Sequence, residues 1–159
     1  MKTAILLFLT MSCFSQVSYS AYVPLRTYHF DRRDANLWWM DKTEGGNIGL
    51  IITRREGLSE IQFGAINNSY GDLSIVAMGG ISAKAGIFRL GVSGGLATGY
   101  KSYYRYLAQG QLQKRDDILS RNGIMPQLAA NISLDKGAFS PLLVISPFFI
   151  NAGIKYNFN

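Results

Sequence analysis

The sequence predicts an all-β fold, an eight-stranded antiparallel transmembrane β-barrel of the kind found in bacterial outer membranes. Three observations predict it. Several segments place apolar residues at every second position, which is the period of a β-strand. The connections between these segments are alternately long and short, as in outer-membrane barrels. After about the first twenty residues, no apolar stretch is long enough to cross a bilayer as a helix.

The N-terminal segment has the features of an export signal. Lys2 supplies the positive start, AILLFLTM is a short apolar core, and the small residues around SYSA suit cleavage. A membrane anchor is the alternative, but the apolar run is shorter than the roughly 20 residues that a spanning helix needs. We therefore expect residues 1–20 to be a signal peptide, residues 21–159 to form a single barrel domain, and the protein to lie in the outer membrane.

Composition limits the partners and the chemistry. The net charge is +6, but the basic residues are spread through loops, which favours an anionic membrane surface over nucleic acid. The expected partners are outer-membrane phospholipid and lipopolysaccharide, and the expected state is a monomer. Cys13 lies in the predicted signal peptide, so the mature chain would offer no thiol. The sequence has no phosphate loop, dinucleotide fingerprint, metal-ligand cluster or nucleophile elbow, and we expect no cofactor.

The first three predicted strands follow from alternation between apolar residues and small or polar ones. A short opening strand is expected around Leu25 to Phe30, and a second from Asn47 to Arg55. The third follows the short connection REGL. The outward residues are Ile48, Leu50 and Ile52 in the second strand and Ile61, Phe63 and Ala65 in the third.

Glycine and serine crowd the inward face of the fourth and fifth predicted strands. The outward residues there are Leu73, Ile75, Ala77 and Ile81, then Phe88, Leu90, Val92 and Leu96. The sixth strand points Pro126, Leu128, Ala130, Ile132 and Leu134 outward. A seventh strand is expected around Phe139 to Ser146, and the eighth points Ala152, Ile154, Tyr156 and Phe158 outward. Eight antiparallel strands can close into a small barrel.

The connections predict which way the barrel faces. The long ones are Asp31 to Gly46, Asn67 to Asp72, Gly99 to Gly123 and Ser146 to Ile150, whereas REGL, AKAG and DKGA are short. Long outer loops and short periplasmic turns are typical of outer-membrane barrels, whereas a soluble lipocalin-like barrel would turn its apolar face inward. Aromatic residues at the long-loop end predict an interfacial belt, with packing inside the loops as the alternative: Trp38, Trp39, Tyr100, Tyr103, Tyr104, Phe148 and Phe149.

Two features of the long-loop end are candidates for function. The stretch INNSYGD bridges the third and fourth strands there, and His29, the only histidine, lies at the outer end of the first strand. His29 shares its inward parity with Thr27, although a buried, hydrogen-bonded histidine without a functional role is the alternative. In the segment from Lys101 to Arg121, basic residues are candidates for binding lipopolysaccharide phosphates, unless they only form a solvated face: Lys101, Arg105, Lys114 and Arg115.

The order of these motifs resembles the outer-membrane lipid A palmitoyltransferases. The features, in order, are YHFDR, GGNIGL, NNSYGD, FRLGVSGGLATGY, a strand that starts at Pro126 and a strand that ends at Pro147. The resemblance implies an eight-stranded barrel that moves a palmitoyl chain from a phospholipid to lipid A, with its active groups at the outer face. His29 matches the essential histidine of the family and Ser69 matches its serine, but Asn68 replaces the family's aspartate. An amide places no negative charge beside an imidazolium, so acid–base catalysis would be weaker.

The resemblance also suggests where the lipid binds. Pro126 and Pro147 lack the N–H that a strand ladder needs, and a break in pairing there would admit a lipid sideways. Small inward residues would leave room for an acyl chain, or would only let a narrow barrel close: Gly80, Gly91, Ser93, Gly95 and Ala129. Only Tyr22 to Leu25 would precede the first strand of the mature chain, which leaves no room for the family's N-terminal helix. With Asn68, this favours the alternative of a non-catalytic barrel that binds lipid or modifies the cell surface through its loops.

Overall fold

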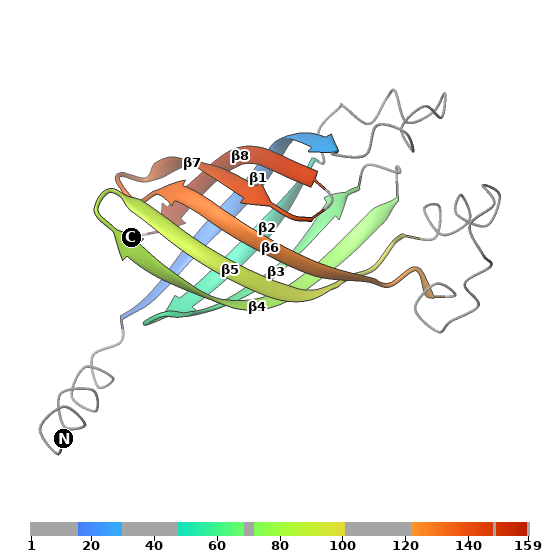
Figure 1. Cartoon of the computed structure of the whole chain (residues 1–159), viewed down its shortest axis with the longest axis horizontal. Coiled ribbons are helices and arrows are strands. Elements are labelled where there is room, and N and C mark those ends of the chain that lie inside the picture. The colour runs from blue at the N-terminus through green and yellow to red at the C-terminus, as the bar shows by residue number, and fades with distance from the viewer. Residues whose placement is uncertain (1–15, 30–47, 69–71, 101–121, 148, 159) are drawn as a thin grey trace, which may run out of the picture.

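The computed structural model is a closed β-barrel in which every strand is antiparallel to its neighbours and β8 closes on β1 (Figure 1). It describes residues 16–29, 48–68, 72–100, 122–147 and 149–158. The eight strands are β1 (Val17–His29), β2 (Gly49–Glu56), β3 (Ser59–Asn67), β4 (Leu73–Ala85), β5 (Phe88–Ala97), β6 (Met125–Leu134), β7 (Phe139–Ile145) and β8 (Phe149–Phe158). The predicted strand number and antiparallel architecture are confirmed.

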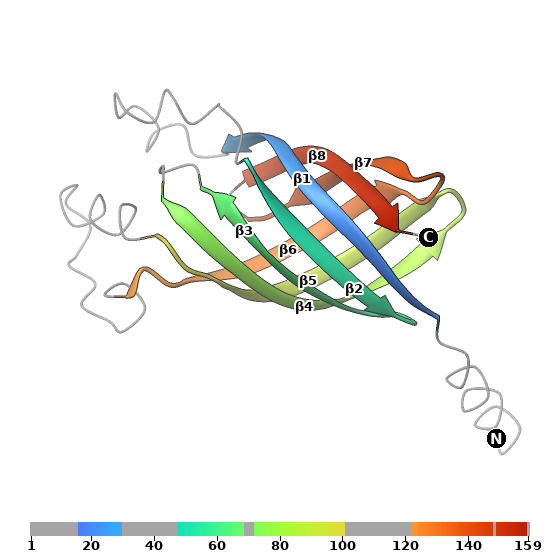
Figure 2. The ribbon, with the colours of Figure 1, turned by 180° about the vertical axis from the view of Figure 1, so that it is seen from behind.

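The two ends of the barrel differ, and we name them by their connections. At the turn end, where the N- and C-termini of the barrel also lie, short turns join β2 to β3, β4 to β5 and β6 to β7 (Figures 1 and 2). Gly57 and Gly86 have φ of 60° and 63° and each begins a two-residue hairpin turn, a position where positive φ favours glycine. The strand ends that the other four connections join lie at the opposite end, which we call the long-loop end. The turn predicted at AKAG is displaced by two residues, because β4 continues to Ala85.

Most of the apolar strand residues that the sequence predicts to face outward are exposed on the outer surface. Leu50, Phe63, Leu90 and Ile132, one from each of four strands, are 38% to 61% exposed on the outer surface. This arrangement contradicts a soluble lipocalin-like barrel, which would bury these side chains inside. In a bilayer, a closed barrel also satisfies every strand's backbone hydrogen bonds without water. Among the described residues, no helix combines the length and apolar character needed to cross a membrane.

The start of β1 differs from the prediction. β1 begins at Val17 rather than near Leu25, and Val17 to Ser20 pair with Glu56 to Thr53 of β2. The predicted signal-peptide boundary at residue 20 therefore falls inside a strand, and the expectation that the strand leaves only Tyr22 to Leu25 before it is wrong. The register against β8 shifts between Pro24 and Arg26, which is a β-bulge. The extra residue reverses the inward parity, so that Thr27 is buried.

Two pairs of adjacent strands, β6–β7 and β1–β2, separate toward the long-loop end. The β6–β7 ladder has only four residue pairs, from Ser133↔Leu142 to Ala130↔Ile145, so Met125 to Ala129 pair with β5 but not with β7. This break adjoins Pro126, where the sequence predicted one. The β1–β2 ladder ends at Tyr22↔Ile51, two residues before Pro24, and this second break was not predicted.

Two of the aromatic residues predicted for the belt, Tyr100 and Phe149, do not face lipid. Tyr100 is buried against Val76 and Ala97 and does not face lipid, because it turns into the mouth of the barrel. Phe149 lines the interior. The other predicted members, Trp38, Trp39, Tyr103, Tyr104 and Phe148, lie outside the described residues. On the outer surface near the turn end, Phe139, Tyr156 and Phe158 pack in series with ring centroids 4.9 and 5.1 Å apart, a position suited to a membrane interface.

Candidate functional site

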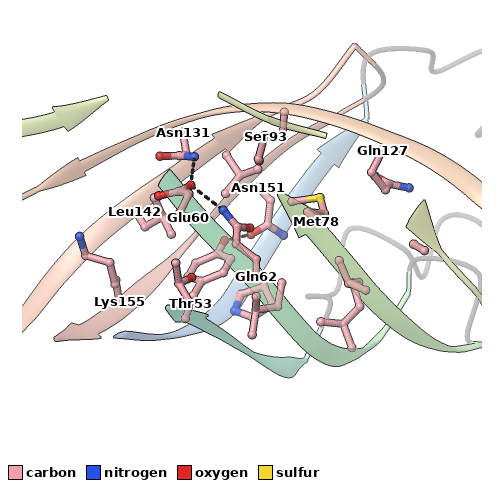
Figure 3. A pocket seen from close by; sticks show the side chains of 18 of the residues that line it. Thr53, Glu60, Gln62, Met78, Ser93, Gln127, Asn131, Leu142, Asn151 and Lys155 are labelled. Carbon is pink, nitrogen blue, oxygen red and sulfur yellow. Dashed lines mark hydrogen bonds between the residues drawn. The ribbon is translucent and has the colours of Figure 1, made fainter. Parts of the chain in front are cut away.

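The interior of the barrel contains a cavity of about 100 Å³ that residues of all eight strands line (Figure 3). Its two halves differ in chemistry. The half toward the long-loop end is mostly apolar and includes Ile51, Ile66, Val76, Met78, Val144 and Phe149, together with the polar Gln127 and Asn151. The half toward the turn end is polar and includes Thr53, Arg55, Glu60, Asn131, Ser133 and Lys155. Such a cavity suits a ligand with a hydrocarbon part and a polar part.

A small buried cluster closes the apolar half beneath the long-loop end. Val76, Ala97 and Tyr100 form its centre, and Ile66 and Met78 pack against them. Burial raises the pKa of Tyr100 to about 12, although hydrogen bonds with Ser74 and Gln127 act in the opposite direction. Tyr100 is therefore a neutral phenol at physiological pH and can contribute hydrogen bonding but no charge.

Glu60 is the centre of a hydrogen-bond network in the polar half. Its side chain is 2% exposed, and its carboxylate accepts hydrogen bonds from Gln62 Nε2 at 2.8 Å and Asn131 Nδ2 at 3.4 Å (Figure 3). An Arg55 guanidinium nitrogen also donates to it, at 3.4 Å. Arg55 Nε also donates to Ser82 Oγ at 3.0 Å. A buried carboxylate is tolerated when donors satisfy it in this way.

A second ion pair lies beside this network at the turn end. Arg89 donates two hydrogen bonds to the Asp135 carboxylate, at 3.0 and 3.3 Å, in the bidentate geometry that arginine favours. Lys84 Nζ is 3.6 Å from the same carboxylate. The hydrogen bonds from Arg89 hold the pKa of Asp135 below its usual range, so Asp135 is ionised at neutral pH.

A third polar chain crosses from β1 to β8. The Tyr22 hydroxyl donates to Asn151 Oδ1, and Asn151 Nδ2 donates to Thr27 Oγ1. All three side chains are buried. Because Tyr22 and Thr27 lie on either side of the bulge at Pro24, this chain joins the two parts of β1 across the irregularity.

The predicted catalytic residues belong to the long-loop end. His29 is the last residue of β1 and pairs through its backbone with Phe149 of β8. Asn68 follows the last residue of β3 and is buried. The backbones of these two residues thus lie at the same end of the barrel. The His29 side chain and all of Ser69 lie outside the described residues, so the predicted contact between them stays a prediction.

The Asn68 side chain structures the connection between β3 and β4. Its Nδ2 donates to Ser74 Oγ at 2.8 Å and to the Gly99 carbonyl at 3.0 Å, and its Oδ1 accepts from the Asp72 amide at 3.0 Å. These bonds join the start of β4 and the segment after β5 to the bend. The predicted role of Asn68 was to orient the histidine, and these three bonds add a structural role.

The predicted substrate-binding residues are spread over the barrel. Gly80 of β4 faces the barrel interior, where a side chain at this position would meet the backbone of Val92 and Ser93 in β5. Pro126 is the second residue of β6 and Pro147 follows the end of β7, so both lie at the long-loop end, as predicted. Lys101 and Arg105 lie outside the described residues. Sequence reasoning did not single out the polar network of Arg55, Glu60 and Lys155, although their inward parity was a usable signal.

Comparison with known proteins supports the fold but does not assign the chain to a family. No family model matches the chain, and a search of curated protein sequences gives no match. A structure from the de novo design of transmembrane β-barrels is similar, with a TM-score of 0.57 and 13% identity over 89% of this chain and 95% of that one. The chain is a β-barrel of the transmembrane type. In the part of the chain that the structure describes, no three His, Cys, Asp or Glu side chains form a group that could hold a metal ion.

Proposed function

We propose that the protein is an outer-membrane barrel that takes an acyl chain of a phospholipid into its interior and transfers it to lipid A. The observation that carries this proposal is the break between β6 and β7, which lies beside the apolar half of the cavity. Ala129 of β6 and Val144 of β7 line the cavity near the break. A hydrocarbon chain that passes between these strands moves from the bilayer to an apolar lining without crossing water.

The proposed chemistry takes place at the long-loop end. His29 acts as the general base and removes a proton from the acceptor hydroxyl of lipid A, whose oxygen attacks the acyl carbonyl of the phospholipid. The phospholipid ester bond then breaks, and the lysophospholipid leaves with the proton. Ser69 polarises the reacting groups or relays the proton, and Asn68 orients the histidine. Lys101 and Arg105 hold lipid phosphates, since cationic side chains form strong charge-assisted hydrogen bonds with them.

Mass spectrometry of lipid A from cells that make the protein tests this proposal. Wild-type protein should add one acyl chain to lipid A, and His29→Ala and Ser69→Ala should abolish the addition. Ser59→Ala is the matched control, because Ser59 is exposed at the opposite, turn end of the barrel. An unmodified lipid A in cells with folded wild-type protein contradicts acyl transfer. Equal modification by the Ser69→Ala protein contradicts the role of Ser69.

A non-catalytic lipid-binding barrel is the second candidate, and the hydrogen bonds of Asn68 favour it. Both Nδ2 hydrogens of Asn68 are donated within the protein, to Ser74 and to the Gly99 carbonyl. A carboxylate at this position could still accept a hydrogen bond from the Ser74 hydroxyl, but it would lose the bond to the Gly99 carbonyl and face that oxygen, at a cost of roughly 1–3 kcal/mol. The contact with Gly99 therefore depends on the amide. Under this candidate, Asn68→Asp reduces thermal stability, and the purified wild-type protein retains phospholipid without ever modifying lipid A.

A further inference from the structure

Lys155 of β8 is a buried cation that faces the cavity. The residue is 4% exposed, and its Nζ donates a hydrogen bond to Ser133 Oγ at 2.8 Å. None of the ion pairs among the described residues includes Lys155. An ammonium group has three donors, and a buried one without an opposite charge is unfavourable. This cation therefore has hydrogen-bonding capacity left for an occupant of the cavity.

The carboxylates near Lys155 already have partners. The charged groups that act on Lys155 electrostatically are Arg55, Arg89, Glu60 and Asp135. Glu60 accepts hydrogen bonds from Arg55, Gln62 and Asn131, and Asp135 is held by Arg89 and Lys84. Lys84 is 58% exposed at the rim, so in this described part of the interior the cations are Arg55, Arg89 and Lys155, and they face two anions, Glu60 and Asp135. The polar half thus has one positive charge in excess, and an anion would balance it.

A second unsatisfied group lines the same cavity. Ser93 of β5 is 4% exposed, and its Oγ is buried with no hydrogen-bond partner. Buried polar atoms in proteins are almost always satisfied, and exceptions call for a missing water or ligand. Ser93 and Lys155 line the same cavity, which therefore offers an occupant a second polar atom besides the ammonium group.

We infer that the cavity binds a carboxylate with a short hydrocarbon chain, with the carboxylate on Lys155. The hydrocarbon part would lie in the apolar half, against side chains such as Ile66, Val76 and Met78. A simple inorganic anion would leave that half without an apolar occupant, and a neutral alcohol would leave the excess charge unbalanced. Because the apolar half lies between Lys155 and the buried cluster of Val76, Ala97 and Tyr100, a short chain is enough to fill the space between them.

This inference does not rest on the proposed acyl transfer. It uses Lys155 in the polar half, whereas the transfer uses His29 and Ser69 at the long-loop end. Binding of a carboxylate and modification of lipid A are measured separately. Either proposal can therefore fail while the other stands.

The test measures binding of three probes, hexanoate, hexanol and acetate, to the purified barrel in detergent by calorimetry. Wild-type protein should bind hexanoate at least tenfold more tightly than hexanol or acetate. Lys155→Met, which keeps the chain length and removes the charge, should weaken hexanoate binding at least tenfold, and Ser93→Ala should weaken it by a smaller factor. Lys136→Met is the matched control, because it removes one exposed positive charge from the turn after β6 and should bind like wild type.

Four outcomes would overturn the inference. They are equal binding by Lys155→Met and wild type, hexanol as tight as hexanoate, acetate as tight as hexanoate, and no binding of any probe. Removing a buried, unpaired charge is expected to leave the fold intact, since well-packed apolar replacements at such sites are usually tolerated. If Lys155→Met does not fold, the comparison of hexanoate with hexanol on the wild-type protein still decides the result.

Discussion

Val92→Arg tests whether the outer face of the barrel lies in hydrocarbon. Val92 of β5 is 52% exposed and pairs with Ile81 and Ala130 on the two neighbouring strands. It lies four residues from Phe88 at the turn end of β5. With a rise of about 3.3 Å per residue and a strand tilt of about 40°, this is about 10 Å along the membrane normal. The apolar band of such barrels is about 25 Å tall, so Val92 lies near its middle.

An arginine at this depth should lower the free energy of unfolding by roughly 2–4 kcal/mol. Ile87→Arg is the matched control, because Ile87 is exposed in the turn between β4 and β5, where the same change should cost only about 0–1 kcal/mol. Equilibrium unfolding of the barrel in phospholipid vesicles with guanidinium chloride measures both values. Equal costs for the two variants would refute the placement of this face in hydrocarbon.

Three further changes test parts of the barrel. A chain that begins at Ala21 loses four β1–β2 pairs and two β1–β8 pairs and should unfold at a lower temperature than one that begins at Gln16; equal midpoints would contradict a contribution from these pairs. Asp135→Asn should destabilise the protein above pH 3.8, the ordinary value for this carboxyl, because the folded-state pKa is depressed. The difference in stability between wild type and Asp135→Asn should disappear as the pH falls through the lower folded-state pKa of Asp135. If thermal melts at pH values well below this pKa still show the difference, the ion pair is not its cause. In denaturant unfolding, Gly95→Ala should cost about 1–3 kcal/mol because its Cβ would lie 2.7 Å from a β4 Cα, whereas Gly79→Ala, with open space, should cost almost nothing.

The outer surface was predictable because each strand repeats one simple rule. A strand of period two has one correct parity, and the apolar parity must face lipid in a barrel without a dry core. Leu50, Leu90 and Ile132 all follow this rule, and the structure exposes them. The same rule placed Lys155 inside, since it alternates with Ile154 and Tyr156. Parity alone does not say what Lys155 contacts, because that depends on strands far away in the sequence.

The features that the sequence did not reveal depend on local competition or distant contacts. The pairing of Val17 to Ser20 was missed because the same small residues resemble a signal-peptide cleavage site. The bulge at Pro24 reverses the parity of β1, so strict alternation fails across it. Tyr100 follows the long-loop end of β5, where the sequence predicts a residue of the membrane interface. Contacts with β4 and β6 bury it instead. The hydrogen bonds of Asn68 similarly join three separate segments.

The two proposals share the apolar half of one cavity, and this has a measurable consequence. In the proposed reaction, an acyl chain that enters beside Val144 would occupy the apolar half and stop before the buried Glu60 carboxylate, which offers no apolar contact. A carboxylate bound at Lys155 would place its own hydrocarbon chain in the same space. The two ligands should therefore exclude each other, and hexanoate should inhibit acyl transfer competitively with respect to phospholipid. In the Lys155→Met protein the inhibition should weaken at least tenfold while the uninhibited rate is unchanged. Inhibition that is equal in both proteins would mean that hexanoate acts elsewhere, for example on the bilayer, and would separate the anion site from the path of the acyl chain.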